Sequence, residues 1–164
     1  EGRERHLLCS IYLDPADMAV YHEKLIAKYE RLKAEEVHYT EYRADDAELL
    51  VVAIGSPSRV AHSAIRVLRE EGVKVGLLRP ITVWPFPYAA ILEYAKSDHV
   101  KAIMVPEMNW GQMIEDVKLA VLATKPVHFV PKHGGLTFTP EDLIGSIRDI
   151  MKNPENPQTL WNVS

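Results

Sequence analysis

Residues 47–58 read Ala-Glu-Leu-Leu-Val-Val-Ala-Ile-Gly-Ser-Pro-Ser, and this stretch decides the fold class. Its apolar run from Leu49 to Ile54 does not alternate with polar residues, which is typical of a strand buried on both faces. Gly55 permits a sharp turn, and Ser56 followed by Pro57 is typical of the start of a helix. The stretch therefore predicts a buried strand that leads directly into a helix.

The same pattern repeats toward the C-terminus. Further apolar runs at residues 73–78, 102–105 and 127–130 alternate with stretches of helical spacing. Strands and helices that alternate through short loops predict a mostly parallel sheet covered by helices on both faces. The positions expected to face the core from the helices are Val60, Ala64, Val67 and Leu68, then Met113, Val117, Ala120 and Val121, then Leu143, Ile144, Ile147, Ile150 and Met151.

Three segments differ in composition. We expect residues 1–46 to form a helical arm or linker, residues 47–152 the compact α/β domain, and residues 153–164 a C-terminal extension. Asp14 and Pro15 predict a capped helix that ends near Lys33, and the following residues are suited to an edge strand. The last helix should begin with a capping box at Thr139-Pro140-Glu141-Asp142. Leu160 and Trp161 are expected to dock the tail against another surface.

The composition of the chain excludes several classes of function. The chain has 164 residues and a formal net charge of -4, without the basic field that binding of nucleic acid needs. Its longest apolar run is too short to span a membrane. We therefore expect no membrane partner and, from the charge, no nucleic-acid partner. We expect a cytoplasmic location. Cys9 is the single cysteine, which we expect to be a buried apolar residue. A cysteine-ligated cluster needs more thiolates than this chain has.

The first candidate site is the turn formed by Gly55, Ser56 and Ser58. Unpaired N–H groups at a helix start can bind an anion, so this turn is a candidate anion-binding helix start. An ordinary strand-to-helix turn with a serine cap accounts for the same residues.

The second candidate site follows the second predicted strand and reads Arg-Pro-Ile-Thr-Val-Trp-Pro-Phe-Pro over residues 79–87. The prolines fix the backbone, so the segment is suited to docking or to forming a wall of an active site. A proline-rich turn that covers its own core with Trp84 and Phe86 is the alternative. The residues proposed for this site are Arg79, Pro80, Thr82, Trp84, Pro85 and Phe86.

The third candidate site follows the next strand and contains Glu107, Asn109 and Gln112. A buried Glu107 could serve as an acid or base, whereas hydrogen bonds to nearby N–H groups would give it a structural role. The histidines have no spacing typical of metal ligands, and we predict neither a metal site nor a catalytic residue.

Together these loops resemble the α subunit of 2-oxoacid:ferredoxin oxidoreductases, in its C-terminal part. The match extends over roughly residues 14–150, with residues 79–87 as its most specific element. The layout is also similar to the C-terminal domain of transketolase. The resemblance implies a three-layer α/β/α sandwich, Rossmann-like, whose mostly parallel sheet has about five strands, one of them antiparallel.

The resemblance also implies a reaction: oxidative decarboxylation of a 2-oxoacid to an acyl-CoA, with electrons passed to ferredoxin. The complete enzyme would use thiamine diphosphate, magnesium and iron–sulfur clusters, and this chain alone would bind none of them. The motif that begins Gly-Asp-Gly is absent from this sequence. The implied partners are the rest of the α subunit, a thiamine-binding β subunit and a γ subunit, in an oligomer with ferredoxin as electron acceptor. This domain would assist assembly and shape the approach to the active site, and would be inactive by itself.

Two other functions fit the same residues. The chain could be an independent module that binds a small molecule or an anion at the helix starts after Gly55 or Gly111. It could also be a dimerisation domain that uses Trp84 and Phe86.

Overall fold

The structure is a computed structural model that describes residue 2 and residues 11–157. It divides into two compact units, and the boundary along the chain lies between Glu36 and Val37. The expectations for Cys9, Leu160 and Trp161 lie outside the described residues.

The first unit contains the helix α1 (Pro15–Glu35). Asp14 caps it as expected, because its carboxylate accepts a hydrogen bond from the backbone N–H of Ala16 at 2.8 Å. None of its residues is buried. A helix without a buried face gains little from tertiary packing within its own unit.

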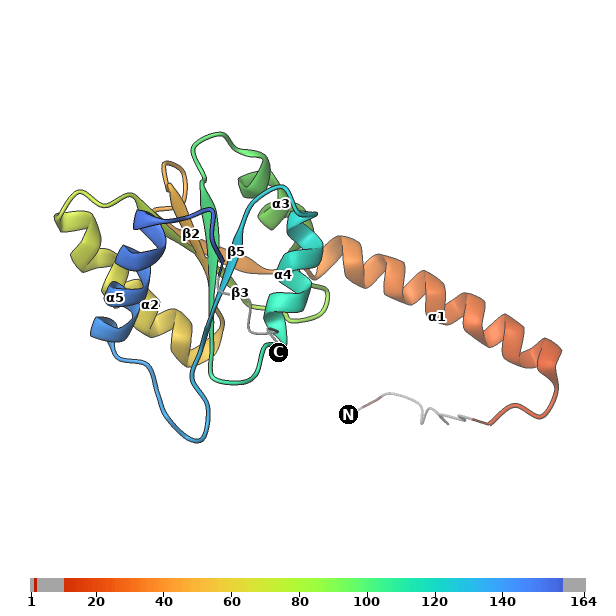
Figure 1. Ribbon diagram of the computed structural model, residues 1–164. Helices are drawn as coiled ribbons and strands as arrows, with labels where there is room; N and C mark the ends of the chain where they lie inside the picture. Colours follow the sequence, from red (N-terminus) through yellow and green to blue (C-terminus); the bar gives the residue numbers. More distant parts are fainter. Residues whose placement is uncertain (1, 3–10, 158–164) are drawn as a thin grey trace, which may run out of the picture. The chain divides into compact units, whose positions relative to one another are not determined.

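The second unit is built on a five-stranded sheet with the strand order β1-β3-β2-β4-β5. β1 is antiparallel to β3, whereas the pairs β3–β2, β2–β4 and β4–β5 are parallel. The mostly parallel sheet predicted from the sequence is therefore confirmed (Figure 1). The elements of this unit, in chain order, are β1 (Tyr39–Tyr42), β2 (Leu49–Val52), α2 (Gly55–Glu70), β3 (Val75–Pro80), α3 (Tyr88–Lys96), β4 (Ala102–Glu107), α4 (Met113–Val121), β5 (Val127–Pro131) and α5 (Pro140–Lys152).

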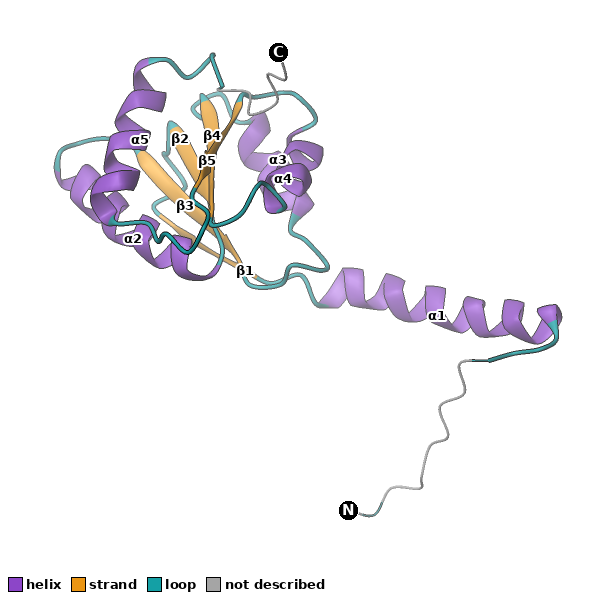
Figure 2. Ribbon diagram, turned by 60° about the horizontal axis from the view of Figure 1, so that its bottom comes forward, coloured by secondary structure: helices purple, strands orange, loops and turns teal. Residues whose placement is uncertain are grey.

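Helices cover both faces of the sheet, which gives the three layers expected of an α/β/α sandwich (Figure 2). Successive strand residues point to opposite faces, so β2 contributes to two cores. Leu50 and Val52 pack with α3 and α4, and Leu49 and Val51 pack with α2 and α5. All four of these β2 residues are fully buried, as the apolar run predicted.

The helix faces match the sequence pattern with two exceptions. Val67 is exposed, because α2 instead buries Ser58, Ala61, Ala64, Ile65 and Leu68. α3 was missed, since its short sequence follows closely after the prolines and offers little periodicity. The capping box of α5 is present as predicted: Thr139 and Asp142 exchange hydrogen bonds at 2.7 and 3.2 Å.

β1 lies within the segment that the sequence assigns to the arm, at residues 1–46. It pairs along β3 from Tyr39↔Pro80 to Tyr42↔Leu77. This pairing joins the edge strand expected near Tyr39 and Tyr42 to the compact unit, which begins at Val37.

Candidate functional site

The loops predicted as sites leave the same edge of the sheet. Parallel strands end at a common edge, and the loops after β2, β3, β4 and β5 all start there. Open α/β sheets place ligands and partners at this carboxyl edge. We call the loop at residues 81–87, after β3, the proline loop. The loop at residues 108–112, after β4, is called the acidic loop for Glu107, the strand residue that precedes it and binds its backbone.

The proline loop is fastened to a segment far away in the sequence. The backbone N–H groups of Ile81 and Thr82 donate to the carbonyl oxygen of His38, at 2.8 and 3.2 Å. The Thr82 hydroxyl accepts from the His38 N–H at 3.1 Å and donates to the Pro85 carbonyl at 2.9 Å. Thr82 therefore holds the loop closed on itself and against the residues that precede β1.

The two aromatic residues of the proline loop have opposite positions. The Phe86 side chain is only 3% exposed and belongs to the core under α3 and α4, whereas Trp84 is 55% exposed. Ile81 and Val83 are also exposed, while Pro80 and Pro85 are buried. Phe86 thus covers the core of its own unit, as one interpretation of the loop predicted. Trp84 is exposed on an apolar surface, which suits the other interpretation, a docking loop or a wall of an active site.

Glu107 ends β4 and is only 4% exposed. Its carboxylate accepts hydrogen bonds from the backbone N–H groups of Gln112, Met113 and Ile114, at 3.2, 2.9 and 2.9 Å. These donors form the start of α4, where no preceding carbonyl can satisfy them and the helix dipole favours a negative charge. The carboxylate is therefore bound to the start of the following helix, which is the structural role given as the alternative in the sequence analysis.

One local hydrogen bond and one contact with the loop after β5 organise the rest of the acidic loop. Asn109 accepts a hydrogen bond from the Gly111 N–H at 2.7 Å. Trp110 is 66% exposed and stacks on His133 of the loop after β5, with the ring centroids 4.1 Å apart. The loops after β4 and β5 therefore meet through an aromatic contact that the sequence did not indicate.

The loop after β5 is held by an ion pair. Lys132 pairs with Asp142 at the start of α5 and also donates to the Thr137 carbonyl at 3.0 Å. Hydrogen bonds from Lys132 and Thr139 lower the pKa of Asp142 to about 2. This loop therefore closes against the last helix of the same unit.

The helix start after β2 differs from its prediction. The first residue outside the helix is Ile54, and no side chain caps it, so Ser56 is not a cap. Gly55 has a φ of 63°, a conformation that favours glycine. The Ser58 hydroxyl is buried and donates to the Gly55 carbonyl at 2.7 Å.

The structure brings Ser58 and Arg79, from two separate sequence motifs, to the lining of one pocket. Arg59 and His62 line the same pocket and were not singled out from the sequence. Their position close to Ser58, in the first turns of the predicted helix, was the one sequence feature that could have indicated them as pocket residues. Gly55 and Ser56 do not line it.

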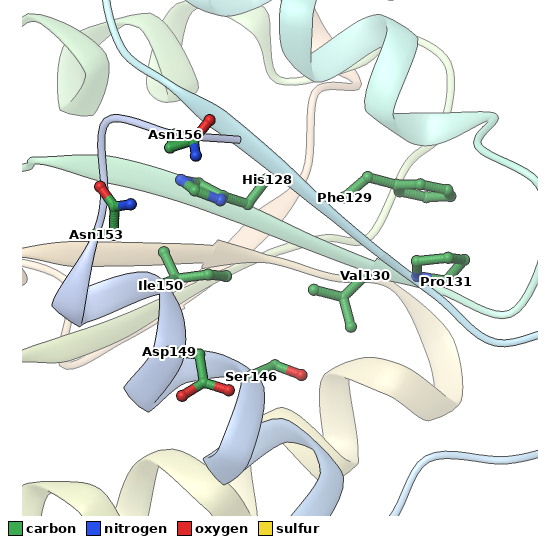
Figure 3. A pocket seen from close by; sticks show the side chains of 9 residues that line it. All are labelled: His128, Phe129, Val130, Pro131, Ser146, Asp149, Ile150, Asn153 and Asn156. Carbon is green, nitrogen blue, oxygen red and sulfur yellow. The ribbon is translucent and has the colours of Figure 1, made fainter. Parts of the chain in front are cut away.

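A second pocket lies at the other border of the sheet, between β5 and α5 (Figure 3). His128 is buried there, and its Nε2 donates to the Pro154 carbonyl at 2.7 Å. That hydrogen bond joins the strand to the segment after α5, which gives His128 a structural role.

Within residues 11–157, no group of three or more His, Cys, Asp or Glu side chains is arranged to hold a metal ion. No helix in the same range combines the length and the apolar character needed to cross a membrane.

The sequence matches the family described as "Pyruvate:ferredoxin oxidoreductase core domain II" over residues 47–143. Among curated proteins, it is 41% identical over 146 residues to "Ketoisovalerate oxidoreductase subunit VorB" of Methanothermobacter thermautotrophicus, covering 89% of this chain and 41% of that protein. It is 38% identical over 125 residues to "2-oxoglutarate synthase subunit KorA" of Methanocaldococcus jannaschii, covering 74% of this chain and 33% of that protein. The chain thus spans about two fifths of the VorB relative and about a third of the KorA relative.

The fold is similar to a solved structure of "2-oxoglutarate:ferredoxin oxidoreductase from Magnetococcus marinus with 2-oxoglutarate, coenzyme A and succinyl-CoA bound". The TM-score is 0.70 and the identity 25%, over 84% of this chain and 24% of that chain. The family match covers more than half of the chain and includes the proline and acidic loops. The resemblance predicted from these loops is therefore confirmed: the chain belongs to the pyruvate:ferredoxin oxidoreductase core domain II family, a domain of 2-oxoacid:ferredoxin oxidoreductases.

Proposed function

We propose that this chain is part of the α subunit of a thiamine-diphosphate-dependent 2-oxoacid:ferredoxin oxidoreductase. The complete enzyme would convert a 2-oxoacid to an acyl-CoA and pass the electrons to ferredoxin. Family membership and the names of the VorB and KorA relatives support this proposal. Because those relatives are named as subunits, we propose a β subunit, a γ subunit and the rest of the α subunit as partners.

The role proposed for this domain is to dock against the thiamine-binding part of the enzyme. Its carboxyl edge does not fit the cofactor itself, because the magnesium ion that accompanies a bound diphosphate needs carboxylate or carbonyl oxygens that are available for coordination. Glu107 and Asp142, the carboxylates that hold the loops of this edge, are engaged with backbone N–H groups and with Lys132. We therefore assign thiamine diphosphate, magnesium and the clusters to other parts of the enzyme.

One observation carries the docking role: the proline loop exposes apolar side chains from a backbone that is firmly held. Ile81, Val83 and Trp84 are exposed, although the loop is tied to His38 and anchored by Phe86. A surface that is already ordered loses little entropy on binding, and exposed tryptophan is enriched among residues that dominate interface energies. These properties favour a contact surface over a catalytic wall.

The test is Trp84→Ala, introduced into the complete enzyme. We expect the affinity between the α subunit and its thiamine-binding partner to fall by about 30-fold, which corresponds to about 2 kcal/mol. Sedimentation would measure assembly, and reduction of ferredoxin with 2-oxoisovalerate, 2-oxoglutarate or pyruvate would measure activity. The VorB relative makes 2-oxoisovalerate the first substrate to test.

Leu119→Ala is the matched control, since Leu119 is an exposed apolar residue toward the far end of α4. An assembled enzyme with unchanged affinity in the Trp84→Ala variant would contradict the docking role. A chain that dimerises alone and becomes monomeric with Trp84→Ala would instead favour the dimerisation function.

A further inference from the structure

A pocket of about 340 Å³ lies where β1 and β3 meet the first turns of α2. Antiparallel pairing places Thr40 of β1 opposite Arg79 of β3. α2 adds Arg59 and His62 one helical turn apart. The residues whose side chains we consider as the lining of the pocket are Thr40, Tyr42, Arg59, His62, Leu77 and Arg79.

The guanidinium groups of the two arginines of this pocket are not engaged by any other residue in the part of the chain that the structure describes. Among the described residues, neither Arg59 nor Arg79 has a side chain that forms a hydrogen bond or an ion pair with another residue. Arg69 on the same helix differs, because it pairs with Asp46 and donates to the carbonyls of Val75 and Arg43. The fold thus satisfies one arginine of α2 and leaves a pair of guanidinium groups at the pocket.

The acidic residue that borders the pocket does not neutralise this pair. Glu41 is opposite Leu78, whose side chain belongs to the core on the other face of the sheet. The Glu41 carboxylate interacts there with the Tyr94 hydroxyl. Glu41 therefore borders the pocket through its backbone, and the pocket keeps an excess of positive charge.

The remaining polar groups hold the pocket in shape. His62 stacks on Tyr42, with ring centroids 4.0 Å apart, which fixes both rings at the wall. The Ser58 hydroxyl is engaged with the Gly55 carbonyl, so it steadies the helix start instead of facing a ligand. Thr40 supplies a hydroxyl beside Arg79.

We propose that this pocket binds the carboxylate or phosphate group of a small molecule, with Arg59 and Arg79 as the recognition residues. Guanidinium groups present paired N–H donors that match the oxygens of carboxylates and phosphates. The volume of about 340 Å³ is at the lower end of the range for small-molecule sites. This site is separate from the apolar surface of the proline loop and does not depend on the docking role.

The test is titration of the 164-residue chain with sodium phosphate and, separately, with disodium succinate, at constant ionic strength and pH. Two-dimensional NMR would follow the backbone amides and the arginine Nε–H groups. We expect saturable shifts that centre on Arg59, His62 and Arg79 for at least one anion. Shifts with phosphate alone indicate a phosphate-bearing ligand, and shifts with succinate alone indicate a carboxylate.

Arg59→Gln and Arg79→Gln should each weaken this binding by about tenfold or more, because each removes charge-assisted hydrogen bonds. Arg66→Gln is the matched control: Arg66 is an exposed arginine of α2 that does not line the pocket. Two results would overturn the proposal. One is the absence of saturable shifts in the wild-type chain at millimolar phosphate and succinate, and the other is an equal loss of affinity in the Arg66→Gln variant.

Discussion

The proline loop and the acidic loop leave the same edge of one sheet, yet different kinds of contact hold them. The acidic loop is organised by partners within seven residues, since Glu107 and Asn109 accept from N–H groups of the same turn. The proline loop depends on His38, which is 44 residues from Thr82, and on burial of Phe86. The hydrogen bonds of the acidic loop therefore need only neighbouring residues, whereas those of the proline loop need the chain before β1 to be in place.

The largest expected effect concerns the buried anchor of the proline loop. Phe86→Ala should lower the free energy of unfolding by about 3–5 kcal/mol, because it leaves a cavity in the core under α3 and α4. Trp84→Ala should change it by less than about 1 kcal/mol, since Trp84 is largely exposed. Urea unfolding of both variants measures the difference. Equal losses of unfolding free energy in the two variants would contradict the interpretation that Phe86 anchors the loop while Trp84 serves only as a contact surface.

A slightly smaller effect is expected in the acidic loop. Glu107→Ala removes the acceptor of three backbone N–H groups and should cost about 3 kcal/mol of unfolding free energy, measured in urea. Glu107→Gln keeps one carbonyl oxygen and should recover part of that loss. The exposed Glu93 offers the control, and Glu93→Ala should stay within about 0.5 kcal/mol of the wild type. A Glu107→Ala variant as stable as this control would show that the loop does not rely on its carboxylate.

The smallest effect extends the comparison to the loop after β5, where Asp142 pairs with Lys132. The native pKa of Asp142, about 2, lies below its ordinary value of 3.8, so the ionised form stabilises the fold above about pH 4. This stabilisation is lost as the pH falls from about 4 to 2. Asp142→Asn lacks it at every pH, so the Tm difference between the two proteins should close over that interval in a circular-dichroism series. A Tm difference that stays constant down to pH 2 would contradict the ion pair.

Apolar runs and capping motifs predicted much of this fold, because each depends only on residues that are close together in the sequence. The apolar runs at residues 49–54, 73–78, 102–105 and 127–130 each contain a strand or most of one, since segments dominated by apolar residues are driven out of water. The capping box at Thr139 and Asp142 was predictable for the same reason, because its partners are three residues apart. Residues 79–87 were the most specific element of the resemblance that identified the family.

Partners distant in the sequence were not predictable. Gly76 carried no signal, although a Cβ at that position would come within 2.6 Å of the Arg43 carbonyl oxygen. The division of roles between Trp84 and Phe86 likewise depends on which of them faces α3 and α4.

The sequence by itself determined the buried strands, the helices α1, α2, α4 and α5, and the family, although it missed α3 and placed Val67 in the core. Only the tertiary structure decided which polar groups at the sheet edge have partners: the start of α4 satisfies Glu107, whereas Arg59 and Arg79 line one pocket and neither has a carboxylate partner among the described residues. The physical reason is that burial is a property of single residues and short segments. A hydrogen bond or ion pair instead requires two groups whose meeting is set by strand pairing and helix packing.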